Sequence, residues 1–283
     1  MTALDKENRL IVIKGAGDLA TGVAHRLFRS GFAVVMTELP HPTVIRLPVA
    51  FAAAVFTGRA TVEGVAAVRT EPAEAAAVAG HGLVAVVVDP QGAVVQALKP
   101  WAVVDAILAK RNTGTRLSDA PVVVGLGPGF AAGRDVGYVV ETARGHYLGR
   151  VIEQGEALPD TGVPGLIGGY GSERLLRSPA HGAFRAARAI GDTVAAGESV
   201  GHVGGLPVTA VIGGVLRGLI HDGLVVAAGQ KIGDIDPRGR REYCFTISDK
   251  ARAVGGGVLE ALLAARAAAE RDLHPCFPSL TRF

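Results

Sequence analysis

The sequence has 283 residues, 49% hydrophobic and 19% charged, with a formal net charge of +3. This length allows two domains with buried cores, and the hydrophobic content excludes an intrinsically disordered chain. Basic residues are scattered and only 5% of residues are aromatic, which argues against nucleic-acid binding. No apolar run reaches the roughly 18 to 20 residues of a membrane-spanning helix. With charged first residues and only two cysteines, neither a signal peptide nor a disulfide framework is indicated, so we expect a cytoplasmic protein that does not contact membranes.

The first predicted element is a short buried strand at 10–13, which leads into a glycine-rich turn and then a helix to residue 29. The turn matches the dinucleotide-binding fingerprint G-x-G-x-x-[G/A], and the next strand ends in an acid where such folds bind a ribose hydroxyl. We therefore predict a nucleotide or phosphate site here; the alternative left open is that the glycines serve packing alone. The predicted cofactor-binding residues at this turn are Gly15, Gly17, Asp18, Ala20 and Glu38.

Strands and helices continue to alternate as far as residue 129. We predict strands at 32–37, 66–70, 83–88 and 121–125, and helices at 42–56, 72–79 and 101–110. This alternation predicts right-handed crossovers and one parallel sheet with helices on both faces, whose carboxyl edge binds ligands. A second glycine loop at that edge, with Gly127 and Gly129, either lies against a flat ligand or simply turns the chain.

A predicted hairpin follows, with strands at 136–140 and 148–153. Its turn holds three candidate catalytic residues, Glu141, Arg144 and His146. An imidazole titrates near neutral pH, so His146 would suit general acid or base catalysis. The simpler interpretation is an exposed turn. The glycine-rich segment at 161–171 is then an interdomain linker or a mobile lid.

A 22-residue unit is written twice, 32 residues apart, at 182–203 and 214–235. Each copy predicts short apolar strands separated by glycine turns, and together they predict a roughly two-fold β-barrel. The pattern resembles biotinyl and lipoyl carrier domains, which carry their group on a lysine at the hairpin between the halves. That hairpin, at 204–207, has no lysine, and Lys231 lies inside the second copy. We therefore expect a carrier-like barrel without a covalent group, whose apolar tip at Leu206 packs against the parallel-sheet domain, a second copy or a client enzyme.

Three glycines at 255–257 precede a predicted helix at 258–271. The free amides at the start of this helix, with Lys250 and Arg252 nearby, favour an anion. The alternative is a glycine-broken helix pair that packs on the sheet or on a second subunit. His274 and Cys276 lack the spacing of metal ligands, and we predict no structural metal.

Together these elements predict an α/β fold: a doubly wound, Rossmann-like parallel sheet, then a biotinyl/lipoyl-like barrel-sandwich β domain and a C-terminal helix. The predicted divisions are a nucleotide- or cofactor-binding domain (1–134), a hairpin with a glycine-rich connection (135–177), the barrel (178–240), and a C-terminal strand and helix (241–283).

Several strings in the sequence resemble the YqeB-like selenium-dependent molybdenum hydroxylase system proteins, nearly end to end. They are VIKGAGDLATGV (12–23), VGLGPGF (124–130), ETARGH (141–146), LRGLI (216–220), KIGDIDPR (231–238) and ISDKAR (247–252) followed by GGGVLE (255–260). The resemblance implies a role in the maturation of molybdenum hydroxylases with labile selenium, beside proteins that handle the molybdopterin cofactor. It implies no catalytic residues. Neither cysteine lies in a catalytic motif, which argues against direct selenium chemistry.

The leading hypothesis is an accessory protein that binds a phosphorylated ligand, either a nucleotide or the molybdopterin cofactor. Its expected partners are a molybdenum hydroxylase or its maturation proteins. One alternative is an NAD(P)-dependent oxidoreductase, which the fingerprint and Glu38 favour. Another is a non-catalytic scaffold. Catalysis and homo-oligomer formation are both left open.

Overall fold

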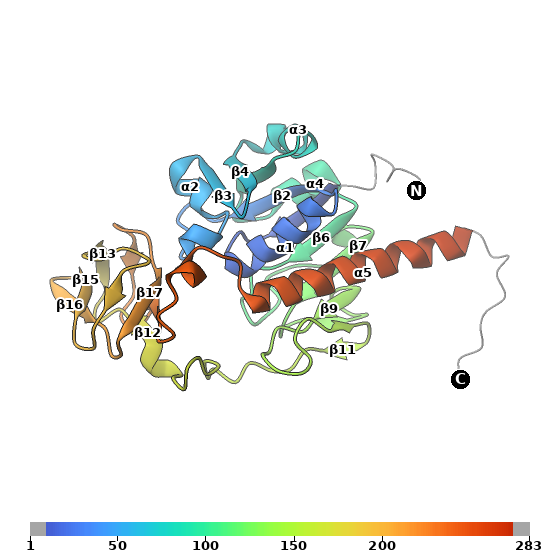
Figure 1. Ribbon diagram of the computed structural model, residues 1–283. Coiled ribbons are helices and arrows are strands. Elements are labelled where there is room, and N and C mark those ends of the chain that lie inside the picture. Colours follow the sequence, from blue (N-terminus) through green and yellow to red (C-terminus); the bar gives the residue numbers. More distant parts are fainter. Residues whose placement is uncertain (1–9, 274–283) are drawn as a thin grey trace.

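The computed structural model describes residues 10–273, and its largest element is a nine-stranded sheet (Figure 1). The strands from β9 through β4 run parallel, and both edge strands pair antiparallel with their neighbours. In spatial order they are β10 (Val151–Ile152), β9 (Tyr138–Val140), β7 (Val122–Leu126), β6 (Ala102–Asp105), β1 (Leu10–Lys14), β2 (Ala33–Glu38), β5 (Val84–Val88), β4 (Val65–Arg69) and β3 (Arg59–Val62). The turn after β1 therefore opens at the carboxyl edge between β2 and β6, where the strand order reverses.

Helices cover both faces of this sheet because its central strands are apolar throughout. Alternate side chains of a strand point to opposite faces, so an unbroken valine and isoleucine run needs cover on both. Val12 packs in the core on one face, whereas Ile11 and Ile13 pack in the core on the other. The covering helices are α3 (Ala75–Gly80) and α4 (Ala93–Leu98) on the first face, and α1 (Asp18–Arg29) and α5 (Asp249–Leu273) on the second.

The helices α1 and α5 lie side by side in close contact (Figure 1) because glycines line their interface. A Cβ at Gly22 would lie 2.7 Å from the Cβ of Ala251, and a Cβ at Gly255 would lie 2.9 Å from the carbonyl oxygen of Gly22. A Cβ at Gly257 would overlap the carbonyl oxygen of Gly149. These glycines let the C-terminal helix return onto the N-terminal sheet.

The C-terminal β unit consists of two four-stranded antiparallel sheets around a core that includes Phe184. The first sheet has the order β12 (Leu175–Arg177), β19 (Lys231–Asp236), β17 (Gly214–Leu219) and β14 (Thr193–Val194). The second has the order β16 (Leu206–Thr209), β15 (Ser199–Val203), β13 (Gly182–Ala186) and β18 (Val225–Val226).

The duplicated sequence corresponds to duplicated strands, with β13, β14 and β15 repeated as β17, β18 and β19. In each copy the third strand pairs with the first. The middle strand instead pairs with the first strand of the other copy, β14 with β17 and β18 with β13. The two copies therefore exchange their middle strands.

The remaining short elements connect these parts. The strands β8 (Ala131–Ala132) and β11 (Gly155–Glu156) form a small antiparallel pair, and α2 (Ala53–Thr57) precedes β3. From β11 a long segment runs past the body of the molecule to β12, and the chain returns from β19 to α5 (Figure 1).

The predicted fold class is wrong in two respects. The large sheet is mixed rather than purely parallel, because β3 and β10 are too closely connected to β4 and β9 for a crossover and pair as hairpins. The duplicated region is organised as two antiparallel sheets with β12 added to one edge, and not as a biotinyl/lipoyl-like barrel-sandwich domain.

Three predicted elements also differ from the structure. The helix predicted at 101–110 is wrong, because the short apolar run Ala102–Asp105 forms β6 and is buried on both faces. The helix predicted at 42–56 reduces to a 3-10 turn and α2. The helix predicted to start at 258 begins at Asp249 and continues through the three glycines, since packing against α1 outweighs the low helix propensity of glycine.

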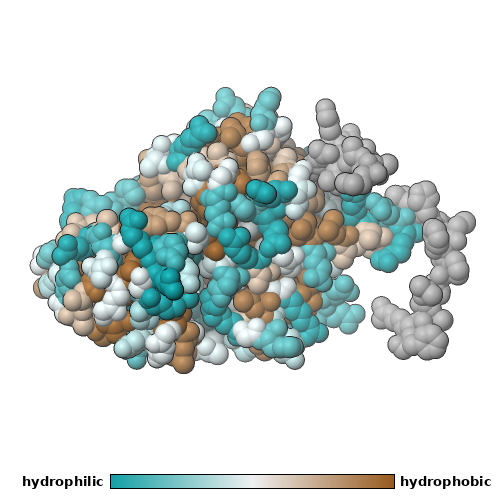
Figure 2. Space-filling model, viewed as in Figure 1, coloured by the Kyte–Doolittle hydropathy of each residue, from teal (hydrophilic) through white to brown (hydrophobic). Residues whose placement is uncertain are grey.

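Leu206, at the tip of the β15–β16 hairpin, is 50% exposed, so the predicted packing of this tip against the large sheet is wrong. Contact with a second copy or a client stays a prediction. On the face shown in Figure 2, hydrophobic side chains form small patches separated by hydrophilic ones. The predictions for His274 and Cys276 lie outside the described residues.

Two neighbouring glycines of α5 should respond to alanine with opposite signs. Gly257→Ala should lower the free energy of unfolding by about 1–3 kcal/mol, because the new methyl overlaps the Gly149 carbonyl. Gly256→Ala should raise it by about 0.5–1 kcal/mol, because that position faces open space and alanine favours helix. Urea unfolding of both variants measures this, and equal effects would contradict the close contact.

Candidate functional site

A cleft lies where the carboxyl edge of the large sheet faces the C-terminal β unit. It comprises two adjoining cavities, the first of about 470 Å3 and the second of about 690 Å3. The residues that line both are Asp18, Leu19, Arg46, Arg174 and Arg217. Because the shared wall combines α1 with strands of the β unit, the cleft exists only when both halves of the chain are folded together.

The predicted glycine turn forms one end of the first cavity. Gly15 has a φ of +94°, and a Cβ there would lie 3.0 Å from the Ala106 carbonyl oxygen, so β1 can turn beside the end of β6 only with glycine. Gly17 precedes α1 without any side-chain cap, and Asp18 begins the helix. The five residues predicted at this turn, Gly15, Gly17, Asp18, Ala20 and Glu38, all line the first cavity.

The Glu38 carboxylate binds the turn itself. Its Oε2 accepts a hydrogen bond from the Ala16 amide at 2.9 Å, and its Oε1 accepts one from the Leu39 amide at 2.8 Å. Burial raises the pKa of Glu38, and these two amide donors oppose that shift. Each oxygen keeps a further lone pair, so Glu38 can still accept a ligand hydroxyl.

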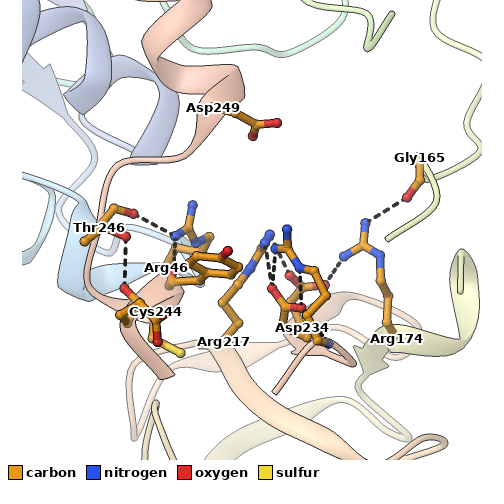
Figure 3. Close-up of polar contacts among 12 residues, drawn as sticks. Arg46, Gly165, Arg174, Arg217, Asp234, Cys244, Thr246 and Asp249 are labelled. Atoms are coloured by element: carbon orange, nitrogen blue, oxygen red, sulfur yellow. Dashed lines mark hydrogen bonds and ion pairs between the residues drawn. The ribbon is translucent and has the colours of Figure 1, made fainter. Parts of the chain in front are cut away.

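Three arginines stand in a row along the shared wall, of which Arg46 and Arg174 are buried and Arg217 is partly buried (Figure 3). Arg46, 5% exposed, follows β2 and donates to Asp18 at 3.2 Å and to the Tyr243 carbonyl oxygen at 2.9 Å. Arg217 of β17 lies between Asp234 at 3.0 Å and Asp236 at 3.3 Å. Arg174, just before β12, binds Asp234 from the other side. The acids fix the guanidinium planes in place.

These arginines are not fully satisfied within the protein. In the part of the chain that the structure describes, the buried Nε atoms of Arg46, Arg174 and Arg217 have no acceptor. Buried donors of this kind are costly unless a partner is supplied. An oxyanion seated at the row would supply acceptors to guanidinium groups that are already held in place.

Two lysines add positive charge, one in each cavity. Lys231, at the start of β19, lines the first cavity, and Lys250, in the first turn of α5, lines the second. Burial lowers the pKa of Lys231, while Asp234 opposes the shift. Burial also lowers the pKa of Lys250, and Arg144 adds to the effect by repulsion. Among residues 10–273 neither ammonium group has an ion-pair partner within 4.0 Å.

The second glycine loop faces the protein rather than the cleft. A Cβ at Gly127 would overlap Oγ1 of Thr142, and a Cβ at Gly129 would lie 2.5 Å from the backbone of Arg111. Neither glycine lines either cavity, although Pro128 between them lines the second. Close chain packing therefore accounts for both glycines.

The three candidate catalytic residues are not brought together. Glu141 is buried, and its carboxylate accepts hydrogen bonds from the amides of Thr142, Ala143 and Leu158, which is a structural role. His146 is exposed and lines neither cavity. Arg144 alone lines the second cavity, where it forms two hydrogen bonds with Asp249, at 2.8 and 3.0 Å.

The glycine-rich segment at 161–171 forms part of the wall of the second cavity. Thr161, Val163, Gly165 and Ile167 line it, and the Gly165 carbonyl oxygen accepts a 3.4 Å hydrogen bond from Arg174 (Figure 3). The segment is thus more than a connection, because it contributes directly to the cleft.

The main residues that sequence reasoning missed are the arginine row and its acids. For the acids, a signal lies where the two repeats differ. Asp234 and Asp236 stand where the first copy has His202 and Gly204, and Lys231 stands where it has Ser199. The arginines carry no such signal, because Arg217 has its counterpart in Arg185, and Arg46 and Arg174 lie outside the repeats.

In the described residues, no group of three or more His, Cys, Asp or Glu side chains is placed to hold a metal ion. Across the same part of the chain, no helix has both the length and the apolar character to span a membrane.

Comparison with known proteins gives one clear sequence relative. The chain is 52% identical over 257 residues to Uncharacterized protein YqeB of Escherichia coli (strain K12). The aligned region covers 90% of this chain and 48% of that protein. The chain therefore spans about half the length of the curated relative it matches. The predicted resemblance to YqeB-like proteins is confirmed at this level, and the printed name says nothing of selenium or molybdenum. No family model matches the chain.

Solved structures give only weak likenesses. A succinylglutamate desuccinylase/aspartoacylase from Rhodobacter sphaeroides aligns with a TM-score of 0.25 at 13% identity, over 81% of this chain and 86% of that one. A succinylglutamate desuccinylase from Silicibacter sp. TM1040 aligns with a TM-score of 0.26 at 14% identity, over 81% and 84%. At these TM-scores the likeness carries no argument about fold or activity.

The Arg144–Asp249 pair at the second cavity should make the free energy of unfolding depend on pH under acidic conditions. The hydrogen bond from Arg144 lowers the pKa of Asp249 from 3.8 to about 2, so the ionised carboxylate stabilises the fold above pH 4. That contribution should disappear as the pH falls from about 4 to 2. Because both side chains are exposed, Asp249→Asn should cost below about 1 kcal/mol at pH 6. Urea unfolding between pH 2 and 6 should show the two proteins converging at the acid end, and a constant difference would contradict this assignment.

Proposed function

We propose that the cleft binds a phosphorylated small molecule, either a nucleotide or the molybdopterin cofactor, and that the chain acts as an accessory protein in the maturation of a molybdenum hydroxylase. The observation that carries the binding proposal is the row of three arginines whose buried Nε atoms find no acceptor among residues 10–273. Guanidinium groups match phosphate geometry, and charge-assisted hydrogen bonds to phosphate are about twice as strong as neutral ones.

The distribution of charge supports an anionic ligand. The second cavity is lined by five cationic side chains against two carboxylates, Asp18 and Asp160. The first cavity balances four cations against four carboxylates. A ligand whose negative charge lies at the shared wall, beside the uncapped start of α1, meets the largest surplus of donors.

The maturation role rests on the resemblance to YqeB-like proteins of the selenium-dependent molybdenum hydroxylase system. The 52% identity to YqeB supports the relationship. In this proposal the cleft presents a phosphorylated cofactor to a client enzyme or to another maturation protein. No covalent attachment is involved, because the hairpin at 204–207 has no lysine.

An NAD(P)-dependent oxidoreductase is the second candidate, and Glu38 is the observation that favours it. Its carboxylate lies in the first cavity beside Gly15, in a place suited to a ribose hydroxyl. Equilibrium binding separates the candidates: an oxidoreductase should bind NADH or NADPH more tightly than the molybdopterin cofactor, an accessory protein should not, and a scaffold should bind none of these.

The repeat supplies a matched pair of arginines for the binding test. Arg217 lies in the cleft, whereas Arg185, its counterpart in the first copy, is 69% exposed and pairs with Asp222. Arg217→Gln should weaken the binding of AMP or the molybdopterin cofactor by about 10- to 100-fold, the loss of one charge-assisted hydrogen bond. Arg185→Gln should leave it unchanged. Isothermal titration calorimetry measures both.

Arg217→Gln removes one of the two arginine partners of Asp234 and of Asp236, and leaves Arg174 and Arg238 as the others. Because both acids are buried, a second variant guards against loss of fold. Lys231→Ser introduces the residue that the first copy has at this place and removes no ion pair within the described residues, so it should weaken binding about tenfold with no loss of stability. If both Arg217→Gln and Lys231→Ser fold and bind normally, the arginine row is not the site.

Gly17→Val tests the glycine turn. Gly17 has an extended backbone with φ −66°, and a Cβ there would only touch Val44 at 3.6 Å, so valine should fit without strain. Its side chain should project where a phosphate approaches α1 and abolish binding, with an unchanged midpoint of thermal unfolding. Normal affinity in the folded variant would remove the turn from the site.

A further inference from the structure

We infer that the cleft takes a ligand with two organic arms joined by a pyrophosphate, with the bridge at the arginine row and one arm in each cavity. This inference rests on the proposed function and names its ligand class. A mononucleotide, with a single organic arm, would fill the first cavity alone. The second cavity, with its surplus of positive charge, would then hold no ligand.

The shared wall is the first observation. Arg46, Arg174 and Arg217 line both cavities at once, so a group bound to them has open space on two sides. Cavities of about 470 and 690 Å3 each have the size that encloses a small organic group, within the usual range of ligand sites. The row presents three guanidinium groups and therefore suits two linked phosphates better than one.

The start of α1 is the second observation. Asp18 and Leu19 belong to the shared wall, and Gly17 provides no side chain to cap the helix. No side chain caps the first amides of this 12-residue helix, and amides at a helix start are donors without a partner inside the helix. The helix start and the arginines thus lie together in the shared wall, where Arg46 donates to Asp18 at 3.2 Å.

The two cavities differ in chemistry, which distinguishes the arms. The first offers carboxylates, Glu38 and Asp89, which accept hydrogen bonds from hydroxyl groups of a sugar. The second offers Arg144 and Lys250 and therefore suits an arm rich in acceptors or carrying its own negative charge. The segment at 161–167 covers this second arm and is tied to the row through Arg174 and Gly165.

The test compares bridged ligands with a half-ligand by isothermal titration calorimetry on the full chain. The probes are NAD+, FAD and diadenosine pyrophosphate as bridged ligands, AMP as a half, and inorganic pyrophosphate as the bridge alone. At least one bridged probe should bind 100-fold or more tightly than AMP, because linking two binding groups makes the second contact intramolecular. Pyrophosphate should compete with both classes.

Two variants assign the arms. Lys250→Met, in the second cavity, should lower the affinity for the bridged probe about tenfold or more and leave the affinity for AMP unchanged. Thr43→Trp, which fills the first cavity from an exposed position, should weaken the binding of AMP and of the bridged probe alike. Lys99→Met, at an exposed lysine outside both cavities, is the control and should change neither.

The outcomes separate this inference from the proposed function. If AMP binds and every bridged probe binds within threefold of it, the two-arm inference is wrong while anion binding at the row stands. The same holds if Lys250→Met weakens AMP as much as the bridged probe. If neither AMP, pyrophosphate nor any bridged probe binds, the proposed function itself fails and the inference with it.

Discussion

The close contact between α1 and α5 determines where the functional groups of this protein lie. Gly22 and Gly255 let the two helix backbones approach closely, and this contact holds the two helix starts close together. Asp18 opens α1 and Lys250 lies in the first turn of α5, so the contact brings both to the cleft. Bulkier residues at this crossing would move one wall of the cleft away from the other.

The cleft illustrates how buried charge can be used for binding. Asp234 and Asp236 neutralise much of the charge of Arg174 and Arg217 and hold their side chains in fixed positions. Breaking such a buried pair is costly, so the guanidinium groups cannot relax toward solvent when no ligand is bound. A ligand therefore meets donors whose side-chain entropy has already been lost.

Residues whose role depends on local sequence could be predicted, and residues assembled by folding could not. The location of Gly15, Gly17 and Glu38 at one edge of the sheet could be predicted, because a strand, a turn and a helix are adjacent in the chain and carry a known pattern; that they bind a ligand stays a prediction. Arg174 reaches the cleft only through the packing of the β unit on the sheet edge. The wrong prediction of a helix at 101–110, where β6 lies, has another cause. A short apolar run suits a strand or a buried helix equally, and here it forms a strand because it pairs with β1 and β7 on either side.

The exchange of middle strands within the duplicated unit has a consequence for how that unit opens. Because β14 completes a sheet with β17 and β18 pairs with β13, neither copy can keep all its backbone hydrogen bonds when the other unfolds. The two copies therefore form one cooperative folding unit rather than two independent modules. Since Arg174, Arg217 and Lys231 all belong to this unit or its entry, local fraying of either copy would dismantle one whole wall of the cleft in a single step.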